Sequence, residues 1–218
     1  MMMLLYLREI QKFVKYCDDN FLHLNVSKTK ELVIDYRTKR YEPQLVVIKD
    51  SNVERTHKYK YLGLVMDDQL CWKDHVEHVN KKLNPRFYCL RKMNKFCVCS
   101  HILEMFYNSV IAGVWMYCVS AWGGNISCEC KRRLASRIKQ AKYISGKELT
   151  SFDPVYRTVI EKKLLKIMKD DTHPLYKVFS EAVSQRSGRM LLPFAATNRH
   201  KSSFVVRAMT IHNELYQR

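Results

Sequence analysis

Two adjacent carboxylates, Asp18 and Asp19, are the residues whose type and spacing come closest to a catalytic arrangement. Paired carboxylates can hold two Mg²⁺ ions for phosphoryl transfer when a tight β-turn presents them and a neighbouring strand supplies a third carboxylate. Here the pair ends a segment, residues 4–21, in which apolar side chains recur at helical spacing. We therefore predict that both residues close a helix, and we expect no catalytic residues.

Histidine and cysteine suggest a second chemistry, metal binding. His75-Val76-Glu77 has the form of an iron-binding triad, but two residues that are two positions apart on a helix point away from each other. The cysteine pairs at 97/99 and 128/130 are closer together than the ligands of zinc sites. We predict no metal site and no cofactor.

The cellular compartment follows from the cysteines and the first residues. Residues 1–7 lack the basic segment of a secretory signal peptide. The eight cysteines are therefore expected to be reduced thiols in an intracellular protein, either in the nucleus or in the cytoplasm.

Positive charge is the strongest functional signal. The 218 residues carry a net charge of +17, and its distribution is uneven. Residues 1–70 have a net charge of +2, whereas residues 71–147 contain 14 basic and 4 acidic side chains, a net charge of +10. A local surplus of this size favours a polyanionic partner, with nucleic acid ahead of a membrane surface. The alternative is a solvated face that has no partner.

The basic residues fall on two predicted helices, where they can neutralise phosphates without reading sequence. The candidates for nucleic-acid binding are Lys81, Lys82, Arg86, Arg91, Lys92, Lys131, Arg132, Arg133, Arg137 and Lys139. Aromatic residues interleave with them and offer either stacking surfaces for bases or core packing: Tyr59, Tyr61, Phe87, Tyr88 and Tyr143.

The sequence lacks the main motifs of several other classes of protein. The six glycines form no dinucleotide-binding, P-loop or nucleophile-elbow motif, and we predict no small-molecule substrate. Residues 105–124 carry no formal charge and are long enough to span a bilayer. Polar interruptions and basic flanks favour a buried helix of a globular domain instead.

The elements that position these residues form an α+β chain. After the helix that ends near Asn20, strands are predicted at 31–36 and 45–48, with a turn at 50–52, and the extended run 59–66 is expected to form a hairpin. Helices follow over 75–93, with a kink expected at Pro85, over 101–121 with Ser100 as N-cap, and over 129–145 with Gly146 as the stop.

The end of the chain is predicted to be less regular. Asp153-Pro154 is typical of a helix start, with Asp153 as N-cap, and a short helix is expected around 175–184. From residue 185 onward the periodicity fades into a loose basic tail. The expected domains are 1–70, 71–150 and 151–218.

The order of several motifs resembles the reverse transcriptases (RNA-directed DNA polymerases) of non-LTR, LINE-type retrotransposons, a class of transposable element. These motifs are YCxxNxLxLNxxKTKE at 16–31, YKYLG at 59–63, WxxH at 72–75, AWGGN at 121–125 and HPL at 173–175. The resemblance covers nearly the whole chain, and the spaced order of the first two motifs is its most specific part.

The resemblance implies a role for each region. Residues 1–70 look like the end of the polymerase palm, with YKYLG as the primer-grip hairpin, and the following helices look like the thumb domain. It adds Lys28, Lys30, Tyr59, Tyr61 and Gly63 to the nucleic-acid-binding candidates. The catalytic aspartates of the family precede the matched region, so the chain is expected to be a fragment that is no polymerase alone, with a complete polymerase as a further partner.

Two alternatives remain open at this point. The chain can be an inert translated fragment without a specific partner. Residues 80–119 also resemble a short N-terminal region of the AlkB homologue eight tRNA-modifying enzyme, but the sequence shows no jelly-roll pattern and no glycine-rich loop for a methyl donor.

Overall fold

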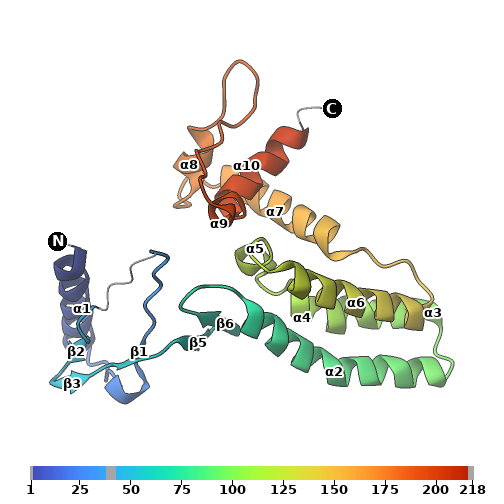
Figure 1. Ribbon diagram of the computed structural model, residues 1–218, viewed down its shortest axis with the longest axis horizontal. Coiled ribbons are helices and arrows are strands. Elements are labelled where there is room, and N and C mark those ends of the chain that lie inside the picture. The colour runs from blue at the N-terminus through green and yellow to red at the C-terminus, as the bar shows by residue number, and fades with distance from the viewer. Residues whose placement is uncertain (1, 38–42, 216–218) are drawn as a thin grey trace. The chain divides into compact units, whose positions relative to one another are not determined.

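The computed structural model describes residues 2–37 and 43–215, which fall into two compact units, Met1–Leu70 and Cys71–Arg218. The predicted α+β class is confirmed, because short two-stranded sheets in the first unit accompany a larger set of helices (Figure 1). The predicted ranges 71–150 and 151–218 both lie in the second unit.

The first unit packs one helix against short strands. Its elements are α1 (Met2–Asp19), η1 (Val26–Lys28), β1 (Lys30–Glu31), β2 (Val47–Ile48), β3 (Ser51–Asn52), β4 (Glu54–Arg55), β5 (Lys58–Tyr61) and β6 (Leu64–Asp67). The apolar stripe of α1 supplies Ile10 and Val14 to a small core around Val46, Ile48 and Val53. The prediction that Asp18 and Asp19 close a helix is confirmed.

The first predicted strand is wrong in extent. Only Glu31 of the range 31–36 belongs to a strand, and β1 pairs with β4 in parallel. The extended ladder stops short of Asp35, whose side chain accepts a hydrogen bond from the Arg37 backbone N–H at 3.0 Å. A local turn of this kind competes with strand pairing.

Two hairpins complete the first unit. The turn between β2 and β3 lies at Lys49 and Asp50, with φ of 47° and 59°, so the predicted turn at 50–52 was misplaced. The hairpin expected within 59–66 is confirmed as β5–β6. Its loop residues Leu62 and Gly63 both have positive φ, 45° and 90°, as a tight hairpin turn with right-handed strand twist requires.

The second unit is helical. Its elements are α2 (Lys73–Lys95), α3 (Ser100–Phe106), the π-helix η2 (Tyr107–Ala112), α4 (Gly113–Met116), α5 (Val119–Trp122), α6 (Cys128–Ser145), α7 (Phe152–Met168), α8 (Tyr176–Ser180), α9 (Asn198–Lys201) and α10 (Phe204–Leu215). Its largest fully buried side chains include Leu83, Phe87, Leu90, Trp122, Leu134, Ile160 and Phe179.

The continuous helix predicted over 101–121 is interrupted. The chain turns at Tyr117 and Cys118, where Cys118 has a φ of 48°, and Cys99 rather than Ser100 holds the N-cap position of α3. The turn directs the Tyr117 carbonyl to the indole Nε1–H of Trp122 at 2.9 Å. This hydrogen bond gives the fully buried Trp122 indole an acceptor at the point where the predicted helix is interrupted.

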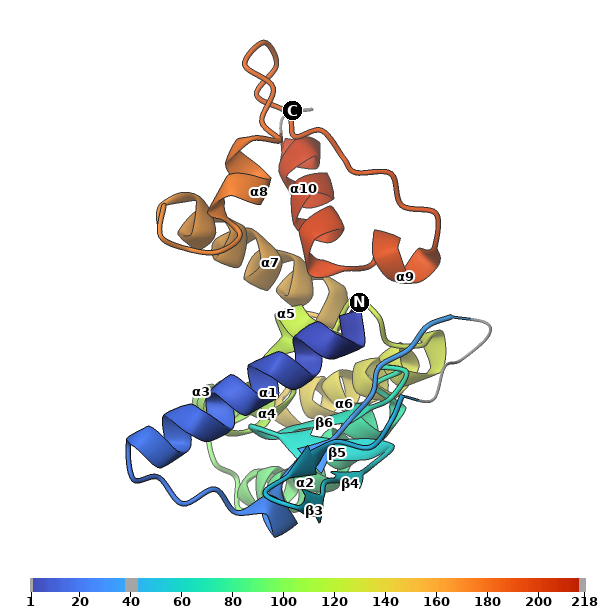
Figure 2. The ribbon, with the colours of Figure 1, turned by 90° about the vertical axis from the view of Figure 1, so that its left-hand side faces the viewer.

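The C-terminal region is more ordered than the sequence predicts. Ser151, not Asp153, is the N-cap residue of α7, and the expected loose tail contains α9 and α10. Helix α10 buries Val206, Ala208, Met209 and Ile211 and packs against α7 (Figure 2). The description of this segment as a loose tail was therefore wrong.

Candidate nucleic-acid interface

Helix α2 has a buried apolar face and an exposed cationic face. Val76, Val79, Leu83, Phe87 and Leu90 are buried at helical spacing. On the exposed side lie four candidates, Lys81, Lys82, Arg91 and Lys92, and half-buried Arg86 donates to the Lys82 carbonyl. Pro85 lies inside the helix without dividing it.

Helix α6 has the same division of faces and is capped at both ends. The Ser127 hydroxyl accepts from the Cys130 N–H at 3.2 Å, and Gly146 ends the helix with a left-handed φ of 65°. The buried side includes Leu134, Ile138 and Ala141. The exposed side carries Arg132, Ser136, Lys139 and Tyr143.

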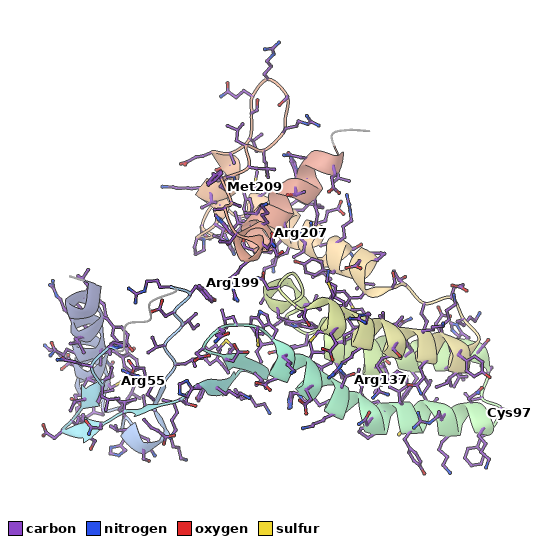
Figure 3. All side chains as sticks on the ribbon, in the orientation of Figure 1. Arg55, Cys97, Arg137, Arg199, Arg207 and Met209 are labelled. Carbon is purple, nitrogen blue, oxygen red and sulfur yellow. The ribbon has the colours of Figure 1, made fainter. Side chains whose placement is uncertain are left out.

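A contact through Arg137 joins the two helices. Helices α2 and α6 lie side by side, and Figure 3 labels Arg137 among their side chains. The guanidinium Nη2 of Arg137 donates to the side-chain oxygen of Asn84 at 2.7 Å. The same guanidinium lies over the ring of buried Phe87, 5.5 Å from its centroid. Arg137 therefore has a packing role between the helices, whatever else it binds.

Three of the candidate cations on α2 and α6 already have acidic neighbours. Lys81 pairs with Glu77 at 2.9 Å, Arg133 with Glu129 at 2.5 Å and Lys131 with Asp153 at 3.4 Å. All these pairs are exposed, so they contribute little to stability and can open for a phosphate. Within the described residues, no ion pair involves Lys82, Arg91, Lys92, Arg132 or Lys139.

The aromatic candidates divide between core and surface. Phe87 is 1% exposed and belongs to the core, whereas Tyr88 is 55% exposed with the Lys92 ammonium 5.5 Å from its ring centroid. Tyr143 is 89% exposed and lies on the cationic side of α6. The sequence offers Tyr143 either for stacking or for core packing, and its exposure, with its spacing from Arg132 and Lys139, favours the surface role.

The candidates in the first unit lie on different elements. Lys28 is exposed at the end of η1, and the Lys30 ammonium is 2.5 Å from the carboxylate of Glu54. Tyr59 and Tyr61, 38% and 55% exposed, lie on β5, and Gly63 lies in the β5–β6 turn. The structure thus groups the α2 and α6 candidates on adjacent helices, while these five belong to the other unit.

The carboxylates that could have suggested catalysis have other partners. Asp18 pairs with Lys49 at 2.5 Å and Asp19 with Lys15 at 3.9 Å, both on the surface of the first unit. Across residues 2–37 and 43–215, no group of three or more His, Cys, Asp or Glu side chains is arranged to hold a metal ion.

His75 and Glu77, which share a possible metal motif, lie on different sides of α2. His75 is buried among aromatic rings, with the Trp122 centroid at 5.0 Å, and Glu77 is exposed. Burial, and to a smaller extent the nearby His78 and the positive charge of Lys82, lower the pKa of His75 to about 4. The two residues therefore cannot ligate one ion together.

The eight cysteines are free thiols, with Cys17 and Cys130 buried. No helix in the described parts of the chain is both long enough and apolar enough to cross a bilayer.

Comparison with known proteins shows a distant, partial similarity. No protein-family model matches the chain, and no solved structure matches it either. The chain is 25% identical over 130 residues to a probable RNA-directed DNA polymerase from the transposon X-element of Drosophila melanogaster. The match covers 58% of this chain but only 14% of the length of that relative. This similarity supports a reverse transcriptase-related origin for the chain.

Proposed function

We propose that this chain is a fragment derived from a LINE-type reverse transcriptase and that it binds nucleic acid through the exposed cationic sides of α2 and α6. The first unit corresponds to the end of the palm and the second begins with the thumb-like region. The fragment has no polymerase activity of its own, and a complete polymerase is a further partner.

The arrangement of α2 and α6 carries the proposal. Both helices bury one face completely, lie side by side and leave basic side chains in solvent on the other. Some of these cations are available to bind phosphates, because Lys92, Arg132 and Lys139 have no ion pair among the described residues. A surface of this kind neutralises phosphates, and its contacts position a nucleic acid without reading its sequence. Similarity to an RNA-directed DNA polymerase agrees with such a ligand.

Salt-dependent binding is the direct test. The affinity of the chain for labelled RNA and DNA is measured by fluorescence anisotropy across a series of salt concentrations. We expect dissociation constants of about 10⁻⁴ to 10⁻⁶ M and, for about five phosphate contacts, a slope of log K against log[salt] of about −3 to −5.

A matched pair of variants locates the interface. The triple variant Lys92→Ala, Arg132→Ala, Lys139→Ala should flatten the slope by about 2 to 3 units, because three phosphate contacts are lost. The control Lys162→Ala, Lys166→Ala, Lys169→Ala removes the same charge from exposed positions on and just after α7 and should change the slope far less. Equal effects of both variants, or no binding by a folded chain, would contradict the proposal.

A further inference from the structure

We infer that the exposed stripe of α6 formed by Arg132, Ser136, Lys139 and Tyr143 is a binding site for single-stranded nucleic acid, with an unpaired base stacked on the Tyr143 ring. This inference rests on the proposed function, and it adds the strandedness of the ligand and the residue that holds a base. The four residues follow the spacing i, i+4, i+7 and i+11, which keeps them on one side of the helix.

The exposure of Tyr143 is the first observation. Its ring is 89% exposed, whereas Tyr107 and Tyr156 in the same unit are 3% and 4% exposed and serve the core. An exposed ring contributes almost nothing to stability by burial. Its neighbours one turn away include Lys139, so the ring stands in a positive field with its face open to a ligand.

The surface beside the ring is the second observation. Ser136, Arg137, Lys139, Gln140 and Tyr143 line a shallow hollow of about 470 Å³. The hollow combines an aromatic face with hydroxyl, amide and cationic groups. Nucleotides match this combination, since the base has a flat π-face and a polar edge and the sugar carries a phosphate. The hollow has no cluster of aliphatic side chains, so it lacks the apolar area that a helix needs to insert into a lipid surface.

Stacking on Tyr143 requires a base with one free face, and this requirement favours a single strand over a duplex. Bases inside a duplex are already stacked on both sides, so a protein ring reaches only bases that are unpaired. Arg132 and Tyr143 are eleven residues apart, about 16 Å along the helix axis. That distance matches about five stacked nucleotides of one strand, with cations along their phosphates.

Tryptophan fluorescence provides a direct test of stacking. The three native tryptophans, Trp72, Trp115 and Trp122, are at most 5% exposed, so the variant Tyr143→Trp places one exposed indole in the site. A short oligo(dT) strand should quench this indole by stacking. Heparin, a polyanion without bases, and a blunt duplex should bind by charge without comparable quenching. Equal quenching by heparin or by the duplex would overturn the inference.

Affinity measurements give the contribution of the Tyr143 ring to binding. Tyr143→Ala should weaken oligo(dT) binding by about 5- to 150-fold, the range for loss of one stacked base, and leave duplex binding unchanged. Tyr143→Phe keeps the ring and should bind as the wild type does. The control Phe194→Ala removes another ring, 90% exposed and outside α6, and should have no effect.

The outcomes separate this inference from the proposed function. If Tyr143→Ala leaves oligo(dT) affinity unchanged while binding remains salt-dependent, the stacking site is wrong and the cationic interface stands. If the folded chain binds neither strand nor duplex, both are wrong. Binding of Tyr143→Trp to anionic phospholipid vesicles with a blue-shifted indole, without quenching by oligo(dT), would instead identify a membrane surface and overturn the inference.

Discussion

The guanidinium of Arg137 donates to the side-chain oxygen of Asn84 at 2.7 Å and thereby joins α6 to α2. The residue belongs by sequence to the same basic helix as Arg132 and Lys139, yet it is half-buried and covers the ring of Phe87. A cation in this position supports the packing of the two helices on which the proposed interface depends. Charge alone therefore does not tell which arginine binds a ligand.

Substituting Arg137 and Arg132 should separate these two roles. Arg137→Ala removes the hydrogen bond to Asn84 and the contact with Phe87, and should lower the free energy of unfolding by about 1 to 2 kcal/mol. Arg132→Ala should change stability by less than about 0.5 kcal/mol, as for an exposed side chain. Urea unfolding followed by circular dichroism measures both values. A larger loss of stability for Arg132→Ala than for Arg137→Ala would contradict the assignment.

The buried histidine predicts a pH dependence of stability. The pKa of His75 is lowered to about 4 in the folded chain, below the value of about 6.5 expected when the chain is unfolded. Between these values the unfolded state binds more protons, so the free energy of unfolding falls as the pH decreases from about 6.5 towards 4. The loss between pH 6.5 and 4 is on the order of 2 to 3 kcal/mol.

Replacement of the histidine checks this origin of the acid sensitivity. His75→Phe keeps an aromatic ring beside Trp122 but cannot be protonated, so its stability should fall less between pH 6.5 and 4 than that of the wild type. The exposed residue His101 is the control, and His101→Phe should retain the slope of the wild type. Identical slopes for wild type and His75→Phe would show that His75 is not responsible.

Replacement of two glycines by alanine should change the stability of the chain in opposite directions. A Cβ atom at Gly124 would lie 2.3 Å from the backbone oxygen of Ser202 and 2.7 Å from the hydroxyl of Tyr156. Gly124→Ala should therefore destabilise the chain by about 1 to 3 kcal/mol. Gly113 has helical φ and no atom within 4 Å of such a Cβ, so Gly113→Ala should stabilise it by about 0.4 to 1 kcal/mol. Thermal unfolding of the two variants measures the contrast.

The purified chain should not extend a primer on an RNA or DNA template with either Mg²⁺ or Mn²⁺. Asp18 and Asp19 lie at the end of α1 and pair with Lys49 and Lys15, so they do not form the carboxylate cluster that two metal ions require. The assay measures incorporation of labelled nucleotides. Template-dependent incorporation that disappears in Asp18→Asn would show that this pair is catalytic after all.

Elements with local sequence signals could be predicted before the fold was known. The apolar residues of α1, α2 and α6 recur at three- and four-residue spacing, and Gly146 marks a helix end that needs positive φ. The cationic stripe of α6 follows from the same periodicity, because the face opposite a buried stripe must be exposed. The position of Asp18 and Asp19 at the end of α1 could also be predicted, because it follows from the local apolar spacing of that helix.

The remaining features could not be predicted, because they depend on contacts with residues far away in the sequence. The chain turns at Cys118, and Trp122 bonds the Tyr117 carbonyl and packs beside His75. No local pattern predicts that His75 is the neighbour of Trp122. Helix α10 forms where the periodicity had faded, since its buried residues gain their stability against α7 rather than from propensity. The separation of Arg137 from its exposed neighbours likewise depends on Asn84 and Phe87, 53 and 50 positions earlier in the chain.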